Sequence, residues 1–203
     1  MTEVEVFADV WCPFTHVGLR RLVEHRAERT DVLLRVRSWP LELVNGQPLD
    51  PALVAEEIDE IRSVVAPDLF AGFDQDHFPT STLDALRLTA QAYRRSGRLG
   101  EAVALELRDR LFERGEDISD PTVLDVVAEA HGLGERDDPD RVVESDWARG
   151  REVGVVGSPH FFTPGDDFFC PALDVRRVDG HLRIAADPEG FERFLESCFP
   201  MDT

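Results

Sequence analysis

Lysine is absent from the sequence. All 22 basic residues among the 203 are arginines, and they stand against 41 aspartates and glutamates, so the formal net charge is −19. The absence of lysine excludes Schiff-base catalysis and a lysine general base. The shortage of positive charge also argues against nucleic acid and anionic membranes as partners, because a strongly acidic surface repels both.

Cysteine is scarce as well. Cys12, Cys170 and Cys198 are odd in number and widely spaced, which fits neither a disulfide framework nor a zinc-ligand pattern. No apolar run approaches the length of a membrane span, and the first residues lack the basic and apolar regions of a secretory signal. A Gly-rich phosphate loop and a nucleotide fingerprint are also missing. We therefore expect a cytoplasmic protein with reduced cysteines and no metal.

The hydrophobic pattern predicts an α/β protein with a long helical segment inside it. Residues 4–9 and 32–39 are β-prone, and the stretch between them has its apolar residues on one helical face, which predicts a βαβ unit. From about residue 50 to 153 the patterns are only helical. The later signals are strands at 160–163 and 168–170, a hairpin around Asp179-Gly180 and a last helix at about 188–199.

Helix starts are marked by Asp-Pro pairs. Aspartate at an N-cap accepts hydrogen bonds from free N–H groups, and proline at the next position has its φ already set for a helix. The pairs lie at residues 50–51, 120–121, 138–139 and 187–188. Ser81 and Asp84 have the spacing of a further capping box.

Cys12 is the residue best placed for chemistry, at the junction of the first strand and the first helix. A helix N-terminus offers free N–H groups and about half a positive charge, which stabilises a thiolate. The N–H groups of Phe14 and Thr15 and the Thr15 hydroxyl lie within reach of such a sulfur. We expect Cys12 to have a lowered pKa and to alkylate fast near neutral pH. A free cysteine is otherwise more often a small buried hydrophobe, so the surrounding motif decides.

That motif resembles the active-site segment of DsbA-like and FrnE-like thioredoxin-fold proteins. Residues 9–15 read Asp-Val-Trp-Cys-Pro-Phe-Thr, where the family has Cys-Pro-x-Cys at the start of its first helix. About 145 residues later, residues 155–161 read Val-Val-Gly-Ser-Pro-His-Phe and resemble the family's Gly-x-Pro-x-Phe signature, whose proline is cis. Residues 111–120, Leu124 and the pair Gly132-Leu133 are similar to the family's helical segment.

The resemblance implies a thioredoxin-like fold with a large all-helical insertion. The thioredoxin-like domain would be discontinuous, with residues 1–45 and 150–203, and the insertion would take 46–149. The cis-proline loop would lie against Cys12, with the Ser158 backbone facing the sulfur. The implied substrate-binding residues are Trp11, Pro13, Phe14, Ser158, Pro159 and His160.

The sequence departs from the family at position 15, where Thr15 stands in place of the second cysteine. A monothiol cannot form an internal disulfide within this motif. Cys170, on the strand after the cis-proline strand, is the candidate resolving thiol, whereas Cys198 is expected in the core. We therefore expect an enzyme like the thiol-disulfide oxidoreductases that uses Cys12 as a single nucleophile, with Thr15 beside it.

Two histidines follow the two motifs. As imidazolium, His16 or His160 would lower the pKa of Cys12, and we assign His16 to the catalytic set. Ordinary packing roles stay open for both, and so does a three-ligand metal site with Cys12.

Two other functions stay open. Kappa-class glutathione transferases and 2-hydroxychromene-2-carboxylate isomerases are a related branch with Ser-Pro-x-Ser, in which a hydroxyl orients the sulfur of glutathione. Cys-Pro-Phe-Thr is intermediate between the branches, so a thiol-dependent transferase or isomerase is one alternative, and a non-catalytic small-molecule-binding protein is another. We expect no tightly bound cofactor. The expected partners are a low-molecular-weight thiol of the glutathione or mycothiol type or a protein disulfide, and a homodimer is compatible with the sequence.

Overall fold

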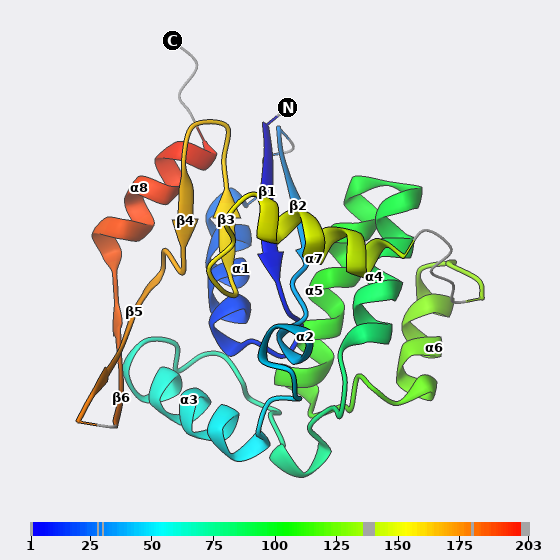
Figure 1. Ribbon diagram of the computed structural model, residues 1–203, viewed down its shortest axis with the longest axis horizontal. Coiled ribbons are helices and arrows are strands. Elements are labelled where there is room, and N and C mark those ends of the chain that lie inside the picture. The colour runs from blue at the N-terminus through cyan, green and yellow to red at the C-terminus, as the bar shows by residue number, and fades with distance from the viewer. Residues whose placement is uncertain (1, 28, 30, 136–140, 180, 200–203) are drawn as a thin grey trace.

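A computed structural model describes residues 2–27, 29, 31–135, 141–179 and 181–199. Its main sheet begins with the expected βαβ unit, in which β1 (Thr2–Ala8) runs parallel to β2 (Val32–Ser38) and α1 (Pro13–Arg26) connects them. β3 (His160–Phe162) pairs antiparallel with the other side of β1, and β4 (Asp167–Phe169) pairs with β3. The order β2-β1-β3-β4 therefore joins the two N-terminal strands and two strands from after residue 159 in one sheet (Figure 1).

The segment between β2 and β3 is helical throughout its regular structure, as the sequence predicts. Its elements are α2 (Leu41–Asn45), α3 (Pro51–Val64), the short 3-10 helix Gln75–His77, α4 (Leu83–Arg95), α5 (Gly97–Arg114), α6 (Pro121–Ala130) and α7 (Val142–Glu152). Gly150 of α7 lies against the rings of Trp39 and Phe7, where an added Cβ would come within 2.5 Å of the Trp39 ring. This close approach lets α7 cross one face of the sheet, while α1 lies behind it (Figure 1).

Side chains of the insertion accept hydrogen bonds along the edge of β2 that faces away from β1. Three alternate backbone N–H groups of this strand point away from β1, and each donates to a helical side chain at 2.9–3.2 Å. The pairs are Leu34 with Glu101, Val36 with Tyr93 and Ser38 with Asp146. The insertion is thus joined to the sheet by hydrogen bonds as well as by apolar packing. The division into residues 1–45 with 150–203 and residues 46–149 stays a prediction.

The C-terminal part forms the expected hairpin and helix. β5 (Leu173–Val178) and β6 (His181–Ala186) make a separate antiparallel pair that lies beside α3, and α8 (Pro188–Cys198) follows (Figure 1). Gly180 of the predicted turn lies outside the described residues. No helix in the described part of the chain is long and apolar enough to cross a bilayer.

Three of the four Asp-Pro pairs start helices as predicted. Asp50, Asp120 and Asp187 are the N-caps of α3, α6 and α8, and each carboxylate accepts a backbone N–H at 2.8–2.9 Å. The fourth pair, at 138–139, lies outside the described residues. The capping box at Ser81 and Asp84 is wrong, because Thr82 is the N-cap of α4 and the Ser81 hydroxyl donates to Glu42.

Candidate functional site

Cys12 lies in the short connection between the end of β1 and the start of α1. It is the N-cap residue of α1, with Pro13 as the first helical residue. Its backbone is extended, at φ −79° and ψ 113°, so its side chain lies at the mouth of the helix. Only 3% of the residue is exposed, so the sulfur is largely shielded from solvent.

The cis-proline loop closes over Cys12. The Ser158–Pro159 peptide bond is cis, and the Cys12 thiol donates to the Ser158 carbonyl oxygen at 3.1 Å. The Ser158 hydroxyl accepts the Asp9 N–H at 2.9 Å. The cis bond and the contact between the Ser158 backbone and Cys12 are therefore as predicted.

Thr15 occupies the fourth position of the motif and is fully buried. Its hydroxyl lies 2.9 Å from the Ser158 hydroxyl, so the group standing in place of the second cysteine is hydrogen-bonded to the cis-proline loop. The Thr15 hydroxyl and N–H also favour the thiolate form of Cys12.

The net electrostatics of Cys12 differ from the prediction. Burial raises the pKa of the thiol above its ordinary value and outweighs the hydrogen bonds from Thr15 and Ser158, which lower it. Glu57 of α3 raises the pKa further, because its negative charge opposes a thiolate. The expectation of a lowered pKa is therefore corrected. A helix N-terminus favours a thiolate, but here the sulfur is also removed from water.

His16 turns away from the sulfur and into the insertion. Its ring packs between Phe70 and Phe112, and its Nε2 lies 2.7 Å from Glu113 Oε1. Burial lowers the pKa of His16. Burial raises the pKa of Glu113, but hydrogen bonds from His16 and from the N–H groups of Phe70 and Ala71 bring it to about 2. A neutral imidazole therefore donates its Nε2–H to a carboxylate.

This arrangement gives His16 a different neighbour from the one expected. The His16 N–H donates to the Cys12 carbonyl at 3.2 Å within α1, but in the described part of the chain no contact joins the His16 ring to the Cys12 sulfur. His16 and Glu113 instead attach the start of α1 to α5 and to the loop at residues 70–71.

His160 is also turned away from the thiol. Its Nδ1 accepts the Val156 N–H at 3.3 Å, so Nε2 carries the proton and donates to Asp167 at 2.9 Å. The ring contacts Phe162 and Phe169. His160 thus holds the loop before the cis-proline against β4. Within the described residues, no three His, Cys, Asp or Glu side chains are grouped as metal ligands.

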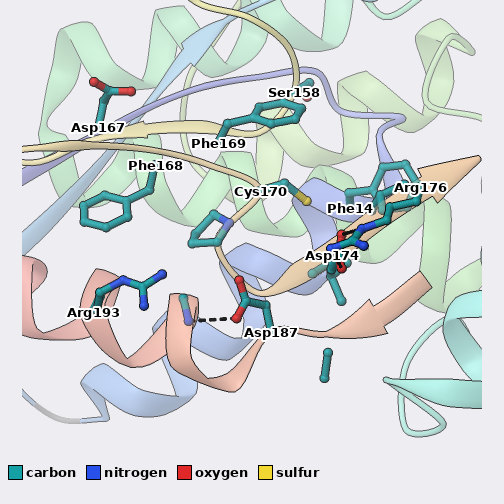
Figure 2. Close-up of a pocket in the computed structure, with 15 residues that line it drawn as sticks. Phe14, Ser158, Asp167, Phe168, Phe169, Cys170, Asp174, Arg176, Asp187 and Arg193 are labelled. Atoms are coloured by element: carbon teal, nitrogen blue, oxygen red, sulfur yellow. Dashed lines mark hydrogen bonds and ion pairs between the residues drawn. The ribbon is translucent and has the colours of Figure 1, made fainter. Parts of the chain in front are cut away.

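A pocket of about 910 Å³ opens beside the cis-proline loop, and Cys12 itself is not among the residues that line it. Phe14 of α1 lines one side, Arg193 of α8 lies on the opposite side, and Cys170 lies between them (Figure 2). Ser158, which accepts the Cys12 thiol, is also part of the lining. The wall combines phenylalanine rings with charged groups, namely Arg193, the pair Asp174–Arg176, Asp167 and Asp187.

The predicted substrate-binding residues divide into two groups. Phe14 and Ser158 line the pocket. Trp11 is fully buried and stacks on Phe78 with ring centroids 5.7 Å apart, so it is part of the core. Pro13, Pro159 and His160 are buried and are not among the residues that line the pocket.

Cys170 lies next to the cis-proline loop. Its N–H donates to the Pro159 carbonyl at 3.1 Å, and its φ of 48° is in the left-handed region. Burial raises the pKa of Cys170 to about 12, and a negative charge on Cys12 contributes to the rise. The two thiols are therefore close enough to interact. Cys198 is fully buried in the core.

Two charged residues beneath the site were not identified from the sequence. Asp9 is fully buried, and its carboxylate accepts the N–H groups of Val10 at 2.6 Å and Leu41 at 2.5 Å. Arg108 is 1% exposed and donates to the Asp9 carbonyl at 3.1 Å. The sequence does contain a signal for Arg108. It lies four residues after Ala104 and one after Leu107, so a charged residue stands on the apolar face of its helix, which indicates a buried charge.

Comparisons with known proteins agree with this geometry. A family model described as "DSBA-like thioredoxin domain" matches residues 3–183, so the thioredoxin-like fold with its helical insertion is as predicted. A comparison with curated protein sequences finds no match.

Solved structures show the same fold at low sequence identity. The cytosolic disulfide reductase DsbM from Pseudomonas aeruginosa is 18% identical, with a TM-score of 0.57, covering 96% of this chain and 97% of its own. A probable DsbA oxidoreductase from Streptomyces coelicolor is 19% identical, with a TM-score of 0.64, covering 100% of this chain and 94% of its own. A 2-hydroxychromene-2-carboxylate isomerase is 14% identical, with a TM-score of 0.59, and the match covers 82% of this chain and 88% of the isomerase chain.

Proposed function

Because the chain belongs to the family of DSBA-like thioredoxin domains, we propose that it is a thiol-disulfide oxidoreductase-like enzyme that uses Cys12 as its only nucleophile. The observation that carries the proposal is the hydrogen bond between the Cys12 thiol and the Ser158 carbonyl of the cis-proline loop, at 3.1 Å. It places one reactive sulfur, held in a defined direction, beside a pocket of about 910 Å³.

The first chemical step is attack on a disulfide. The Cys12 thiol loses its proton to water, and the thiolate is held by the Thr15 N–H and hydroxyl groups. The thiolate attacks one sulfur of R–S–S–R′, which forms Cys12–S–S–R and releases R′–S⁻. The leaving thiolate then takes a proton from water. One disulfide is broken and one is formed, so the enzyme itself is oxidised to a mixed disulfide.

The second step needs another thiol. Thr15 has no sulfur, so the mixed disulfide persists until a thiolate R″–S⁻ attacks Cys12–S–S–R, forms R–S–S–R″ and returns Cys12 as a thiolate. We propose a low-molecular-weight thiol of the glutathione or mycothiol type for this role and a location in the cytoplasm. Both are supported by the structural neighbour DsbM, a cytosolic disulfide reductase with a second structure described as "with GSH".

Cys170 is the alternative source of that thiol. It lies on the pocket wall near Cys12, but burial raises its pKa to about 12. A thiol with such a pKa is almost wholly protonated at neutral pH, and the thiolate is the nucleophile. We therefore assign resolution mainly to a thiol from solution.

A transferase or isomerase that binds a thiol without redox change is the second candidate. The hydroxyl of Thr15, next to the sulfur and 2.9 Å from the Ser158 hydroxyl, favours it. So does the large pocket, which would accept a second substrate.

Intact-protein mass spectrometry separates these functions. We expect the wild type to gain one low-molecular-weight thiol after exposure to the corresponding disulfide. Cys12→Ser should lose the adduct, while Cys170→Ser and Cys198→Ser should keep it. No adduct, with saturable binding of the reduced thiol, would favour the transferase. Neither adduct nor binding would overturn both functions.

A further inference from the structure

Arg108 is a buried charge beneath the active site that the proposed chemistry has not used. It is 1% exposed, and its guanidinium donates to two backbone carbonyls, Ala104 at 2.7 Å and Asp9 at 3.1 Å. Its Nε has no hydrogen-bond partner in the described part of the chain. Because a buried charge is costly unless an opposite charge compensates it, Arg108 needs an anion nearby.

Hydrogen bonds connect Arg108 to the reactive sulfur. The Asp9 peptide accepts from Arg108 through its carbonyl, and the Asp9 N–H donates to the Ser158 hydroxyl at 2.9 Å. Ser158 in turn contacts the Thr15 hydroxyl at 2.9 Å and accepts the Cys12 thiol at 3.1 Å. The guanidinium is therefore linked to Cys12 through two residues, Asp9 by its backbone carbonyl and N–H and Ser158 by its hydroxyl and carbonyl.

Four acidic groups of the described residues act most strongly on Arg108. They are the Asp9 carboxylate, the Cys12 thiol, the Tyr93 phenol and Asp109. Asp109 pairs with Arg20. Burial raises the pKa of the Tyr93 phenol well above its ordinary value, so it stays neutral. Asp9 and Cys12 are left to compensate the charge.

We propose that Arg108 is a positioning residue for Cys12, whose buried guanidinium stabilises the thiolate through the Asp9–Ser158 network while Asp9 competes for the same charge. The inference deepens the proposed function, on which it rests for the role of the thiolate. The sequence suggested that His16 would be the cation that lowers the pKa of Cys12. In this proposal Arg108, on α5 of the insertion, takes that role. His16 is neutral and bonded to Glu113.

The other groups around Cys12 each favour or oppose its thiolate form. Thr15 on α1 and Ser158 on the cis-proline loop favour the thiolate, and Glu57 on α3 opposes it. Cys170 is neutral, with a pKa of about 12. Arg108 is a cation of the described residues that interacts electrostatically with Cys12.

The rate of alkylation of Cys12 against pH tests this role. Arg108→Met keeps much of the apolar stem and removes the charge. We expect its profile to shift to higher pH by a unit or more, which is roughly a tenfold lower rate at pH 8. Arg108→Lys should restore part of the rate. The matched control is Arg110→Met on the same helix, since Arg110 pairs with Glu106 and Glu116 away from the sulfur, and it should keep the wild-type profile. Superimposable profiles for Arg108→Met and wild type would overturn the proposal.

A measurement on the wild type covers the case in which Arg108→Met fails to fold. Burial raises the pKa of Asp9 to about 6, so protonation of Asp9 below that pH would free Arg108 for the thiolate. The logarithm of the rate should fall with unit slope above pH 6 and less steeply below it. An unbroken unit slope down to pH 5 would contradict the competition. Alkylation needs no disulfide substrate, so the expected profiles without a mixed disulfide would support Arg108 and remove only the proposed function.

Discussion

Cys12 combines two opposing influences on one sulfur. The start of α1 and the Thr15 hydroxyl favour a thiolate, while burial and the Ser158 carbonyl favour the protonated thiol, which is the form that donates the observed hydrogen bond. The balance raises the pKa. This makes the resting enzyme a protected thiol, whose reactivity depends on pH and on what enters the pocket.

The pH dependence of alkylation follows from this balance. Because the pKa of Cys12 is raised above 9.0, we expect its rate to keep rising from neutral pH to beyond pH 9, about tenfold per unit until the pKa is approached. Cys170 and Cys198, with pKa values of about 12, should react more slowly at each pH. Peptide mapping after timed iodoacetamide treatment measures all three sites. A plateau for Cys12 near pH 7 would show a lowered pKa instead.

Thr15→Cys should convert the monothiol into a dithiol. Positions 12 and 15 are three residues apart at the first turn of α1, so their side chains share a face. A second sulfur there would resolve the mixed disulfide at an effective concentration in the millimolar range or higher. In an insulin-reduction assay with a low-molecular-weight reductant, we expect the variant to exceed the wild type severalfold and Cys12→Ser to be inactive. Equal turnover by wild type and variant would mean that another thiol already resolves the intermediate efficiently.

At the residue scale, the sequence predicts contacts carried by a motif better than contacts made by a single side chain. The positions of Cys12, Thr15 and Ser158 follow from two short motifs whose backbone geometry is shared. The partner of His16 does not, because Glu113 lies 97 residues away and helical spacing alone cannot show which neighbour a ring turns toward.

Helix α1 is fixed at its start by the contact between His16 and Glu113. Glu113 accepts from the imidazole at 2.7 Å and from the N–H groups of Phe70 and Ala71 at 2.8 and 3.0 Å. One carboxylate on α5 therefore positions the helix that carries Cys12 and the loop beside it. The order of elements gives no hint of this, since the loop has no regular structure of its own.

Glu113→Gln should destabilise the protein in a pH-dependent way. Its pKa is lowered from 4.5 to about 2 in the folded state, so the stability that it contributes is present above pH 4.5 and is lost as the pH falls toward 2. At pH 7 we expect the free energy of unfolding to fall by about 1–3 kcal/mol, as for hydrogen bonds to a charged group. Urea unfolding at pH 7 and pH 3 measures it, and the difference between wild type and variant should shrink at pH 3.

Asp84→Asn is the matched control for this experiment. Asp84 is an exposed acid paired with Arg87 on α4, and surface pairs of this kind contribute little. It should leave the midpoint nearly unchanged at both pH values. A Glu113→Gln effect that is equal at pH 7 and pH 3 would contradict the role of the charge.

The elements themselves are largely predictable, and the exceptions have local causes. Alternation and apolar stripes locate the strands and helices, and Asp-Pro pairs locate three helix starts. The capping box at Ser81 fails because Glu42, from the distant α2, takes the Ser81 hydroxyl and the Thr82 N–H at 2.9 and 2.8 Å. The Ser81 hydroxyl still accepts a local N–H, from Leu83 at 3.2 Å, but it donates its own proton to a tertiary partner, which a local pattern cannot reveal.

At the scale of the whole molecule, the helical insertion is bound to the sheet at the edge of β2. Glu101, Tyr93 and Asp146 come from α5, α4 and α7 and accept N–H groups of a strand that would otherwise have an open edge. Open edges favour pairing with other chains. The sequence predicts both parts but not this junction, because each bond joins residues more than 50 positions apart.

Glu101→Ala tests whether the two parts unfold as one. Glu101 is 5% exposed, accepts the Leu34 N–H and pairs with Arg26, which is itself buried. The substitution leaves a buried guanidinium and a strand N–H without their acceptor, so we expect a loss of about 3–5 kcal/mol. Tyr93→Phe is the milder control. It removes one hydroxyl from the same edge and should cost about 1 kcal/mol.

The shape of the unfolding curve carries the second half of this test. If the edge bonds couple insertion and sheet, urea should unfold both variants in a single transition at a lower midpoint. That transition should be the same by far-UV circular dichroism, which follows the helices, and by the fluorescence of Trp39 beside the sheet and Trp11 beside Cys12, measured in a Trp147→Phe background that removes the tryptophan of α7. Two separate transitions in Glu101→Ala would show that the insertion folds as an independent unit, and the hydrogen bonds at β2 would then be a docking contact between two stable bodies.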